Sequence, residues 1–317
     1  MLRIGVLVQP GFQLLSLGAM SVFEMANVSA GQALYEIRVV SELGGPVRSS
    51  MGTSVETTPF APMRFDTLVV VGVVNPGPSS PPVVDFVRRS LGRFRRVSAI
   101  CTGAFVLGEA GLLEGRRATT HWKYARDLAQ RYPKAHVEED RIFIVDDSVW
   151  TSAGMSAGID LAIGMVEKDF GGDLARDVAR KMVVYHRRAG GQSQHSALLE
   201  MDAKSDRIQN ALAYAKRNLR KPLSVEDLAE AVHLSPRQFS RAFRAETGKS
   251  PAKAVEHLRL EAARLMIEQS HHPIDVVATE TGFADRERMR RAFMRAFGQP
   301  PQVIRRNARA ELASAPS

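Results

Sequence analysis

The chain has 317 residues, of which 44% are apolar and 24% are charged, a composition typical of a globular protein. Its longest apolar run, residues 67–74, is too short to span a bilayer, and its first residues predict a strand rather than a secretory signal. Cys101 is the one cysteine, which excludes an intramolecular disulfide and is typical of a reducing compartment. We therefore expect a cytoplasmic protein with no membrane partner.

The formal net charge of +9 is unevenly distributed along the chain. Residues 201–317 carry 21 lysines and arginines against 14 acidic residues, a net charge of +7, whereas residues 1–200 carry 22 against 20, a net charge of +2. This excess favours a polyanionic partner for the C-terminal part of the chain.

The first half of the chain alternates between β-rich runs and segments of helical length. Strands are predicted at 3–9, 35–41, 67–72, 96–101 and 141–146, and helices at 14–28, 82–94, 103–111 and 122–132. Several of these strands are continuously apolar, as expected for strands buried on both faces. The alternation predicts an α/β domain with a mainly parallel sheet.

The pattern changes near residue 190. Before it, a short strand, a glycine-rich turn and a helix ending at Gly171 are followed by a further helix over 173–186. After it comes a polar segment with a glycine pair, and then helical patterns alone. We expect an α/β domain at 1–190, a linker at 191–205, an all-α domain at 206–306 and a disordered tail at 307–317.

The C-terminal part contains an internal repeat. Phe239, Phe243, Gly248 and Pro251 recur 50 residues later as Met289, Phe293, Gly298 and Pro301. Each copy predicts a helix, a turn and a second helix, so the sequence predicts two helix-turn-helix units.

The second helix of each unit has an apolar face and a polar face. In the first unit Ser235 is the expected N-cap, Pro236 opens the helix, and Phe239, Ala242 and Phe243 point inward. In the second unit Asp285 is the expected cap, and Met289, Ala292 and Phe293 point inward. The outward positions, which we expect to read DNA in the major groove, are Arg237, Ser240, Arg241, Arg244, Arg286, Glu287, Arg290 and Arg291.

One helix at 252–269, with Val255, Leu258, Ala262, Leu265 and Met266 on its apolar face, is expected to hold the two reading helices about 34 Å apart. The other interpretation of these outward faces is a solvated basic surface on a small helical bundle. Two roles are open for Glu287: it accepts a hydrogen bond from a cytosine amino group, or it binds Arg290 or Arg291 on its own helix.

Residues 206–306 resemble the arabinose-regulator (AraC/XylS-type) DNA-binding domain. The matching residues are Ala229, Ser235, Phe239, Phe243, Gly248, Pro251, Arg259, Ala278, the pair at 282–283, Phe293, Gly298 and Pro301. The resemblance implies that the two helices enter successive major grooves of promoter DNA. It implies that this domain is itself monomeric. The expected partners of the whole chain are RNA polymerase and a second copy of the chain, in a homodimer that forms through the α/β domain at 1–190.

The segment "ICTGAFVLGEAGLLEGRRATTHW" at 100–122 and the segment "TSAGMSAGID" at 151–160 resemble the ThiJ/PfpI superfamily of glutamine amidotransferase-like domains. The match covers residues 3–185 and implies a flavodoxin-like, amidotransferase-like α/β fold. The pairing with a C-terminal arabinose-regulator domain resembles one subgroup, the GlxA type. Enzymes of the superfamily hold a nucleophilic cysteine on a strand-to-helix turn, and Cys101 occupies that place. The start of the following helix is expected to lower the pKa of the thiol.

Two of the three catalytic parts of those enzymes are absent here. The histidine that follows the cysteine is replaced by Thr102, and Ser16 stands near the position of the glutamate. His121 is the remaining candidate base, or else a structural or pocket residue. We therefore predict no catalytic residue, with Cys101 as a vestigial nucleophile that packs in a pocket wall or senses oxidation.

What remains is a ligand pocket at the carboxyl ends of the parallel strands. Its expected lining is Ser16, Asn75, Pro76, Cys101, Thr102, His121, Trp122, Met155 and Ser156. The indole of Trp122 either binds a cationic ligand or packs in the core. No cofactor motif and no metal site is recognised in the sequence.

We therefore expect a DNA-binding transcriptional regulator, an activator, that responds to a small metabolite. Relatives in the subgroup point to an amino acid or a quaternary amine as the effector. The alternative is a bifunctional protein whose N-terminal domain is an active, Cys101-dependent amidase or glyoxalase-like hydrolase.

Overall fold

The computed structural model describes residues 1–184, 190, 194, 205–270 and 272–306. Most of the expected linker and all of the expected tail lie outside these residues. The chain divides into two compact units between residues 194 and 195. We refer to residues 1–194 as the α/β unit and to residues 205–306 as the helical unit.

The continuously apolar strands of the α/β unit form the centre of one sheet. The eight strands of this sheet are β1 (Leu2–Leu7), β2 (Tyr35–Ser41), β3 (Gly45–Arg48), β4 (Ser54–Pro59), β5 (Thr67–Val71), β6 (Arg96–Ile100), β9 (Phe143–Asp146) and β10 (Val149–Ser152). Their order is β3-β4-β2-β1-β5-β6-β10-β9, in which only β3 and β9, at the two edges, pair antiparallel to their neighbours. The predicted mainly parallel α/β fold is confirmed.

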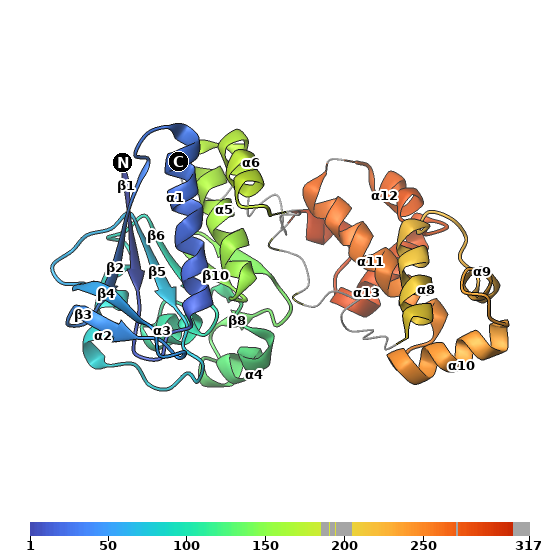
Figure 1. The fold of residues 1–317 in the computed structure, drawn as a ribbon, viewed down its shortest axis with the longest axis horizontal. Helices are drawn as coiled ribbons and strands as arrows, with labels where there is room; N and C mark the ends of the chain where they lie inside the picture. Colours follow the sequence, from blue (N-terminus) through green and yellow to red (C-terminus); the bar gives the residue numbers. More distant parts are fainter. Residues whose placement is uncertain (185–189, 191–193, 195–204, 271, 307–317) are drawn as a thin grey trace. The chain divides into compact units, whose positions relative to one another are not determined.

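Helices cover both faces of this sheet (Figure 1). They are α1 (Gly18–Ala30), α2 (Pro81–Ser90), α3 (Gly103–Glu109), α4 (Trp122–Arg131), α5 (Ser156–Phe170) and α6 (Gly172–Lys181). Side chains of α1, α5 and α6 pack on one face with Ile4 and Ile100, while those of α2, α3 and α4 pack on the other with Leu7 and Val97. Successive residues of a strand face opposite ways, so each central strand supplies both cores.

Some expected boundaries in this unit are wrong. The segment expected to be helical from residue 14 begins with a 3-10 turn, Leu14–Leu17, and the α-helix starts only at Gly18. The helix expected over 173–186 ends at Lys181. Four strands were not predicted because they are too polar or too short for a periodic signal: β3, β4, and the short pair β7 (Arg117–Ala118) and β8 (His136–Val137).

In the helical unit, the described part contains α8 (Asp206–Arg217), α9 (Val225–Glu230), α10 (Pro236–Thr247), α11 (Pro251–Gln269), α12 (Ile274–Glu280) and α13 (Arg286–Phe297). The first core gathers α8, α9 and α10 around Phe239 and Phe243, and the second gathers α12 and α13 around Met289 and Phe293. Each of the two predicted helix-turn-helix units therefore has a small core of its own.

The prediction of a single apolar face for the long helix, α11, is wrong. Val255 and Leu258 of α11 belong to the first core, whereas Leu260, Ala263 and Ile267 belong to the second. Ala262, Leu265 and Met266 are only half-buried. A helix that lies between two cores buries two faces, so α11 makes one body of the two helix-turn-helix units.

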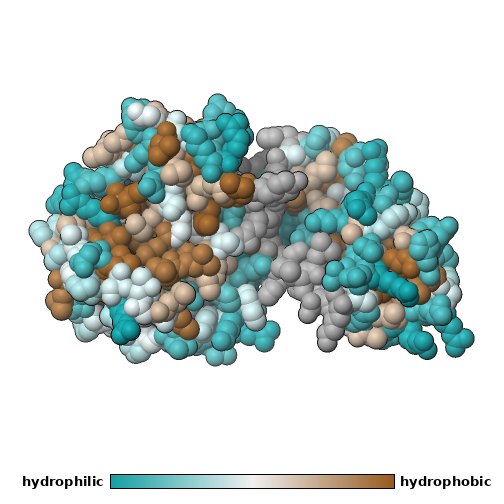
Figure 2. All heavy atoms as spheres, viewed as in Figure 1, coloured by the Kyte–Doolittle hydropathy of each residue, from teal (hydrophilic) through white to brown (hydrophobic). Residues whose placement is uncertain are grey.

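Hydrophilic residues dominate the visible face of the helical unit, while hydrophobic residues gather on the visible face of the α/β unit (Figure 2). This difference agrees with the uneven charge of the sequence. Among the described residues, no helix is long and apolar enough to cross a membrane.

Candidate functional site

The first reading helix, α10, begins as its sequence predicts. The Ser235 hydroxyl accepts a hydrogen bond from the Gln238 backbone N–H at 3.4 Å, and the Ser235 N–H donates to the Gln238 side chain at 3.2 Å. Phe239 and Phe243 are fully buried, and the half-buried Ala242 packs against the same core, so all three point inward as predicted. Burying one face fixes which side chains point outward.

The outward face of α10 carries three exposed arginines, Arg237, Arg241 and Arg244, beside the half-buried Ser240. None of these arginines forms a hydrogen bond or an ion pair with any described residue. A guanidinium without an intramolecular partner is available to a guanine edge or a phosphate.

The second reading helix, α13, is capped by Asp285, whose carboxylate accepts from the Arg288 backbone N–H at 2.7 Å. Met289, Ala292 and Phe293 are buried, as predicted. Arg291 makes no hydrogen bond or ion pair with a described residue.

Glu287 binds Arg290 in a two-bond pair. The two guanidinium nitrogens donate to the two carboxylate oxygens at 2.8 Å each. These hydrogen bonds lower the pKa of Glu287 and raise that of Arg290, so both groups stay charged near neutral pH. Arg286 lies 3.8 Å from the Asp275 carboxylate. Of the two roles that the sequence left open for Glu287, the structure shows the pairing with an arginine of its own helix, and that arginine is Arg290.

A close backbone contact joins the two helix-turn-helix units. The Arg259 guanidinium donates to the carbonyls of Leu219 at 3.2 Å and Lys221 at 2.8 Å, beyond the end of α8. Gly282 has a φ of +79°, and a Cβ there would meet the Leu219 carbonyl oxygen at 1.8 Å. Glycine at this position and the Arg259 bonds hold the second unit against the first.

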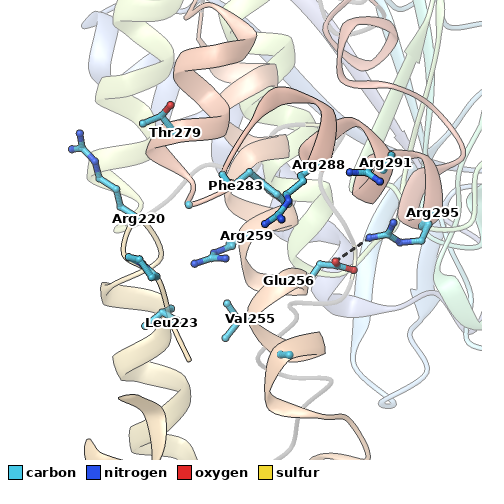
Figure 3. Close-up of a pocket in the computed structure, with 14 residues that line it drawn as sticks. Arg220, Leu223, Val255, Glu256, Arg259, Thr279, Phe283, Arg288, Arg291 and Arg295 are labelled. Atoms are coloured by element: carbon cyan, nitrogen blue, oxygen red, sulfur yellow. Dashed lines mark hydrogen bonds and ion pairs between the residues drawn. The ribbon is translucent and has the colours of Figure 1, made fainter. Parts of the chain in front are cut away.

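Next to this contact lies an open cleft of about 690 Å³ (Figure 3). Five arginines and one glutamate stand among its described lining residues: Arg220, Arg259, Arg288, Arg291, Arg295 and Glu256. Of these residues only Arg291 was expected to bind DNA, and Arg288 and Arg295 were not predicted. The repeat contains a signal for both, since the residues 50 positions earlier, Gln238 and Ala245, are uncharged.

The α/β unit has a cavity of about 610 Å³ at the carboxyl ends of its central strands. Residues that follow β1, β2, β5 and β6 line it. In the sheet, β2 lies on one side of β1 and β5 on the other, so the direction in which strands are added reverses at β1. Parallel sheets bind ligands at such a switch point. Three of the nine expected pocket residues line this cavity: Asn75, Pro76 and Thr102. Among its described lining residues Glu42 alone is charged, and its carboxylate accepts from the Ser80 hydroxyl at 2.5 Å.

Cys101 lies at the predicted strand-to-helix turn, between β6 and α3, with a strained φ of +58°. Its side chain is buried, with 1% of the residue exposed, and it does not line the cavity described above. Burial raises the pKa of the thiol to about 11, and hydrogen bonds with Thr102 offset only part of this effect. The expected lowering of the pKa by the helix start is therefore wrong, because desolvation is the larger effect.

The other expected pocket residues also lie outside that cavity. Ser16 is buried, and its hydroxyl has no hydrogen-bond partner among the described residues. His121 caps α4, where its Nδ1 accepts from the Lys123 N–H at 3.3 Å. Trp122 is 51% exposed, so packing in the core is excluded for it. Met155 and Ser156, both exposed, stand at the start of α5.

Gln194 is a further residue that the sequence analysis treated only as part of a linker. Its side-chain N–H groups donate to the carbonyls of Thr120 at 2.8 Å and Glu139 at 3.0 Å, and its side-chain oxygen accepts from the Trp122 N–H at 2.8 Å. Nothing in its local sequence signals these bonds, which depend on loops far away in the chain.

No group of three or more histidine, cysteine, aspartate or glutamate side chains that could hold a metal ion occurs among the described residues.

Two family models match the sequence. The model of the DJ-1/PfpI family matches residues 3–168, and the model of a helix-turn-helix domain matches residues 228–307. The HTH-type transcriptional regulator CdhR of Pseudomonas aeruginosa is 30% identical over 304 residues, which cover 94% of this chain and 90% of the relative. The expected resemblance to regulators with this pair of domains is confirmed.

Two further matches concern part of the chain. The isonitrile hydratase of Pseudomonas putida is 38% identical over 135 residues, which cover 41% of this chain and 58% of the enzyme. The crystal structure of an AraC family transcriptional regulator from Pseudomonas putida covers 57% of this chain and 100% of its own, with a TM-score of 0.53 at 22% identity. That structure supports the fold.

Proposed function

Because the chain belongs to the DJ-1/PfpI family and joins this α/β fold to a helix-turn-helix domain, we propose that it activates transcription from promoter DNA when a small metabolite binds its α/β unit. It is a DNA-binding transcriptional regulator. Activation, the metabolite and the recruitment of RNA polymerase are the proposed parts.

One observation carries the assignment to DNA. Two helices, α10 and α13, each bury an aromatic or methionine face and turn exposed arginines outward. Among the described residues, Arg237, Arg241 and Arg244 of α10 and Arg291 of α13 have no hydrogen-bond or ion-pair partner. One rigid helix, α11, belongs to both of their cores. Such a pair fits two successive major grooves, where arginine binds guanine through two hydrogen bonds.

The test is selection of bound sequences from a random DNA library by the full chain. We expect a bipartite site whose halves lie one helical turn apart, about 10 base pairs. Arg241→Ala and Arg291→Ala should each cost about 1–3 kcal/mol in affinity and relax the preference at one base position, in different halves. Lys216→Ala, on the exposed face of α8, is the control. If both arginine variants keep the affinity and the sequence preference, the assignment of the reading faces is wrong.

The cavity at the switch point supports metabolite binding. Its one charged lining residue in the described chain, Glu42, favours a ligand with a positive group, such as an amino acid or a quaternary amine. A thermal-shift screen of the full chain against amino acids, polyamines and quaternary amines tests this. We expect a saturable shift with one cationic compound that Glu42→Gln weakens and Cys101→Ala keeps. A shift with anionic compounds alone would contradict the ligand class.

Catalysis by the α/β unit is the second candidate, since a relative is an enzyme and the Cys101 turn is strained. We propose binding without turnover. Support comes from the buried, protonated thiol and from Thr102 and Ser16 in place of the base and the acid. The purified chain should not hydrolyse simple amides, hydrate isonitriles or convert methylglyoxal. Turnover that disappears in Cys101→Ala would establish the enzyme instead.

The remaining proposals are a homodimer and a place in the cytoplasm. Sedimentation of the full chain, alone and with its selected DNA, tests the first, and a dimer that forms without DNA is the expected result. Cell fractionation tests the second.

A further inference from the structure

The arginine cleft of the helical unit is not explained by the two reading faces. Arg288, Arg291 and Arg295 occupy positions i, i+3 and i+7 of α13, so they form one stripe along the helix. Figure 3 shows Arg288 and Arg291 beside each other on α13, with Arg259 facing them from α11. Arg291 thus belongs both to the expected reading face and to the wall of the cleft.

The charges of the cleft are only partly compensated. Arg295 pairs with Glu256 at 3.0 Å, and Arg220 pairs with Glu280 at 3.2 Å. Arg288 lies 3.8 Å from its own cap residue, Asp285, with both side chains more than half exposed. Exposed pairs of this kind are weak, so they yield readily to a polyanion. The cleft therefore presents a surplus of positive charge next to the second reading face.

The fold does not require these cations. The second helix of the first unit is likewise capped and buries an apolar face, yet it carries Gln238 and Ala245 at the positions equivalent to Arg288 and Arg295. Since one copy of the repeat folds without the two charges, folding does not account for them in the other copy.

We propose that this cleft holds the phosphodiester backbone of DNA, with Arg288 and Arg295 binding phosphates while Arg291 reads bases beside them. The proposal rests on the proposed function. Guanidinium groups bind phosphate oxygens through two hydrogen bonds, and such contacts fix the register of a reading helix without reading sequence. The second unit would then anchor the protein on the duplex, whereas the first, whose three exposed arginines have no partner among the described residues, mainly selects bases.

The repeat itself supplies the test variants, Arg288→Gln and Arg295→Ala, which copy the first unit. Binding of the full chain is measured by fluorescence anisotropy for the selected site and for an unrelated duplex, over a series of salt concentrations. We expect each variant to weaken both complexes by the same factor, about 3- to 10-fold, and to flatten the salt dependence by about 0.9 in log–log slope per lost phosphate contact. Lys216→Ala should change neither quantity, and thermal melts check that all variants are folded.

The failures are distinguishable. A wild-type chain that selects no DNA sequence overturns the proposed function itself. Selective binding that both variants keep, with an unchanged salt slope, overturns the cleft assignment alone. A loss of affinity for the selected site with none for unrelated DNA also overturns it, because the two arginines would then read bases.

A second, independent observation concerns Gln194, the last described residue of the α/β unit. Besides its side-chain bonds, its backbone N–H donates to the Asp140 carboxylate at 2.7 Å. Its partner Thr120 also donates a hydrogen bond from its hydroxyl to the carbonyl of Cys101 at 2.8 Å. The next residue, Thr102, lines the cavity and donates to the Val73 carbonyl at 2.6 Å. A chain of hydrogen bonds thus runs from the cavity wall to the residue from which the connection to the helical unit departs.

We infer that Gln194 is a latch that reports the state of this cavity to the DNA-binding unit, and this too rests on the proposed function. Ten residues of sequence separate Gln194 from Ser205, the first described residue of the helical unit. The preceding described residue, Gly190, accepts at its carbonyl from the Phe143 N–H at 3.3 Å. Release of Gln194 removes its hydrogen bonds at the point in the chain that joins the α/β unit to the helical unit.

The test is Gln194→Ala in the full chain, with Gln130→Ala on the exposed face of α4 as the control. The Trp122 amide should exchange its hydrogen faster in Gln194→Ala, and the affinity for the selected DNA site should change several-fold, although no residue of the helical unit is altered. Faster exchange with unchanged DNA affinity and unchanged promoter activity would overturn the inference that Gln194 links the cavity to the DNA-binding unit. It would leave the DNA-binding assignment intact, since that depends on the wild-type chain.

Discussion

At the residue scale, burial decides the chemistry of the candidate side chains. Cys101 occupies the turn that its sequence predicts, and the start of α3 lies next to it, yet the thiol is protonated because it has lost its contact with water. The arginines of α10 show the opposite case, since they are exposed and pair with no described residue. In each case the residue type is visible in the sequence, but its solvent exposure is not.

The Cys101 thiol should be unreactive in the folded protein. A pKa of about 11 against the ordinary 9.0 lowers the thiolate fraction at pH 8 about 100-fold. Alkylation by iodoacetamide, followed by mass spectrometry, should be at least that much slower than in guanidinium-unfolded protein. Rapid labelling of the folded chain at pH 7 would contradict the burial described here.

The same shift in pKa affects stability. A thiol whose folded pKa lies above its unfolded value stabilises the fold fully below about pH 9, and this contribution is lost as the pH rises through about 11. The free energy of unfolding, measured with denaturant, should therefore fall more steeply between pH 9 and pH 11 in the wild type than in Cys101→Ala. Equal slopes would contradict the raised pKa.

Glu287→Gln separates the two roles of this residue. Since Glu287 holds Arg290 in a two-bond pair, its neutralisation should free that arginine and remove a negative charge from the reading face. We expect several-fold tighter binding both to the selected site and to unrelated DNA, measured by anisotropy at fixed salt. Weaker binding to the selected site with tighter binding elsewhere would instead assign Glu287 to a cytosine.

At the element scale, one buried ion cluster joins strands and helices that are distant in the sequence. The Asp169 carboxylate, at the end of α5, accepts from the hydroxyl of Tyr35 at 2.9 Å and from the guanidinium groups of Arg95 and Arg96 at 2.7 Å each. Arg96 also lies 4.5 Å from the ring centroid of Trp150. Burial lowers the pKa of Arg96 and raises that of Tyr35. The cluster thus fixes the end of α5 to the amino-terminal ends of β2 and β6, opposite the strand ends that line the cavity.

Asp169→Asn should therefore destabilise the α/β unit by about 3–5 kcal/mol, because Arg96 would remain buried without its counter-ion. Asp173→Asn breaks the exposed pair that Asp173 forms with Arg176 in the first turn of α6 and should cost less than about 1 kcal/mol. Urea unfolding of both variants measures the difference. Similar losses in the two variants would mean that the buried cluster contributes no more than a surface pair.

At the scale of the whole molecule, the two units have separate cores, so they should unfold separately. Ile163 in α5 and Ile267 in α11 are both fully buried, so the same substitution can be compared in the two units. Each Ile→Val substitution should cost about 0.5–1.5 kcal/mol. We expect two calorimetric transitions. Ile163→Val should lower the midpoint temperature of only one of them by a few degrees, and Ile267→Val that of only the other. One transition that both substitutions lower equally would show that the units unfold together.

The sequence by itself determined the local and periodic features. Alternating apolar strands and helices predicted the α/β fold, and the 50-residue repeat with Ser235 and Asp285 as caps predicted both reading helices. These features depend on neighbours within a few residues, where hydrogen bonding and side-chain period act directly.

Only the tertiary structure decided which residues come together. It brought Asn75, Pro76 and Thr102 to a cavity with Glu42, placed Cys101, His121 and Trp122 outside that cavity, and set Arg288 and Arg295 in a cleft with Arg259. It also joined Gln194 to loops that lie more than 50 residues earlier in the chain. Burial, pKa and such contacts arise from side chains far apart in sequence, whose distances no local pattern encodes.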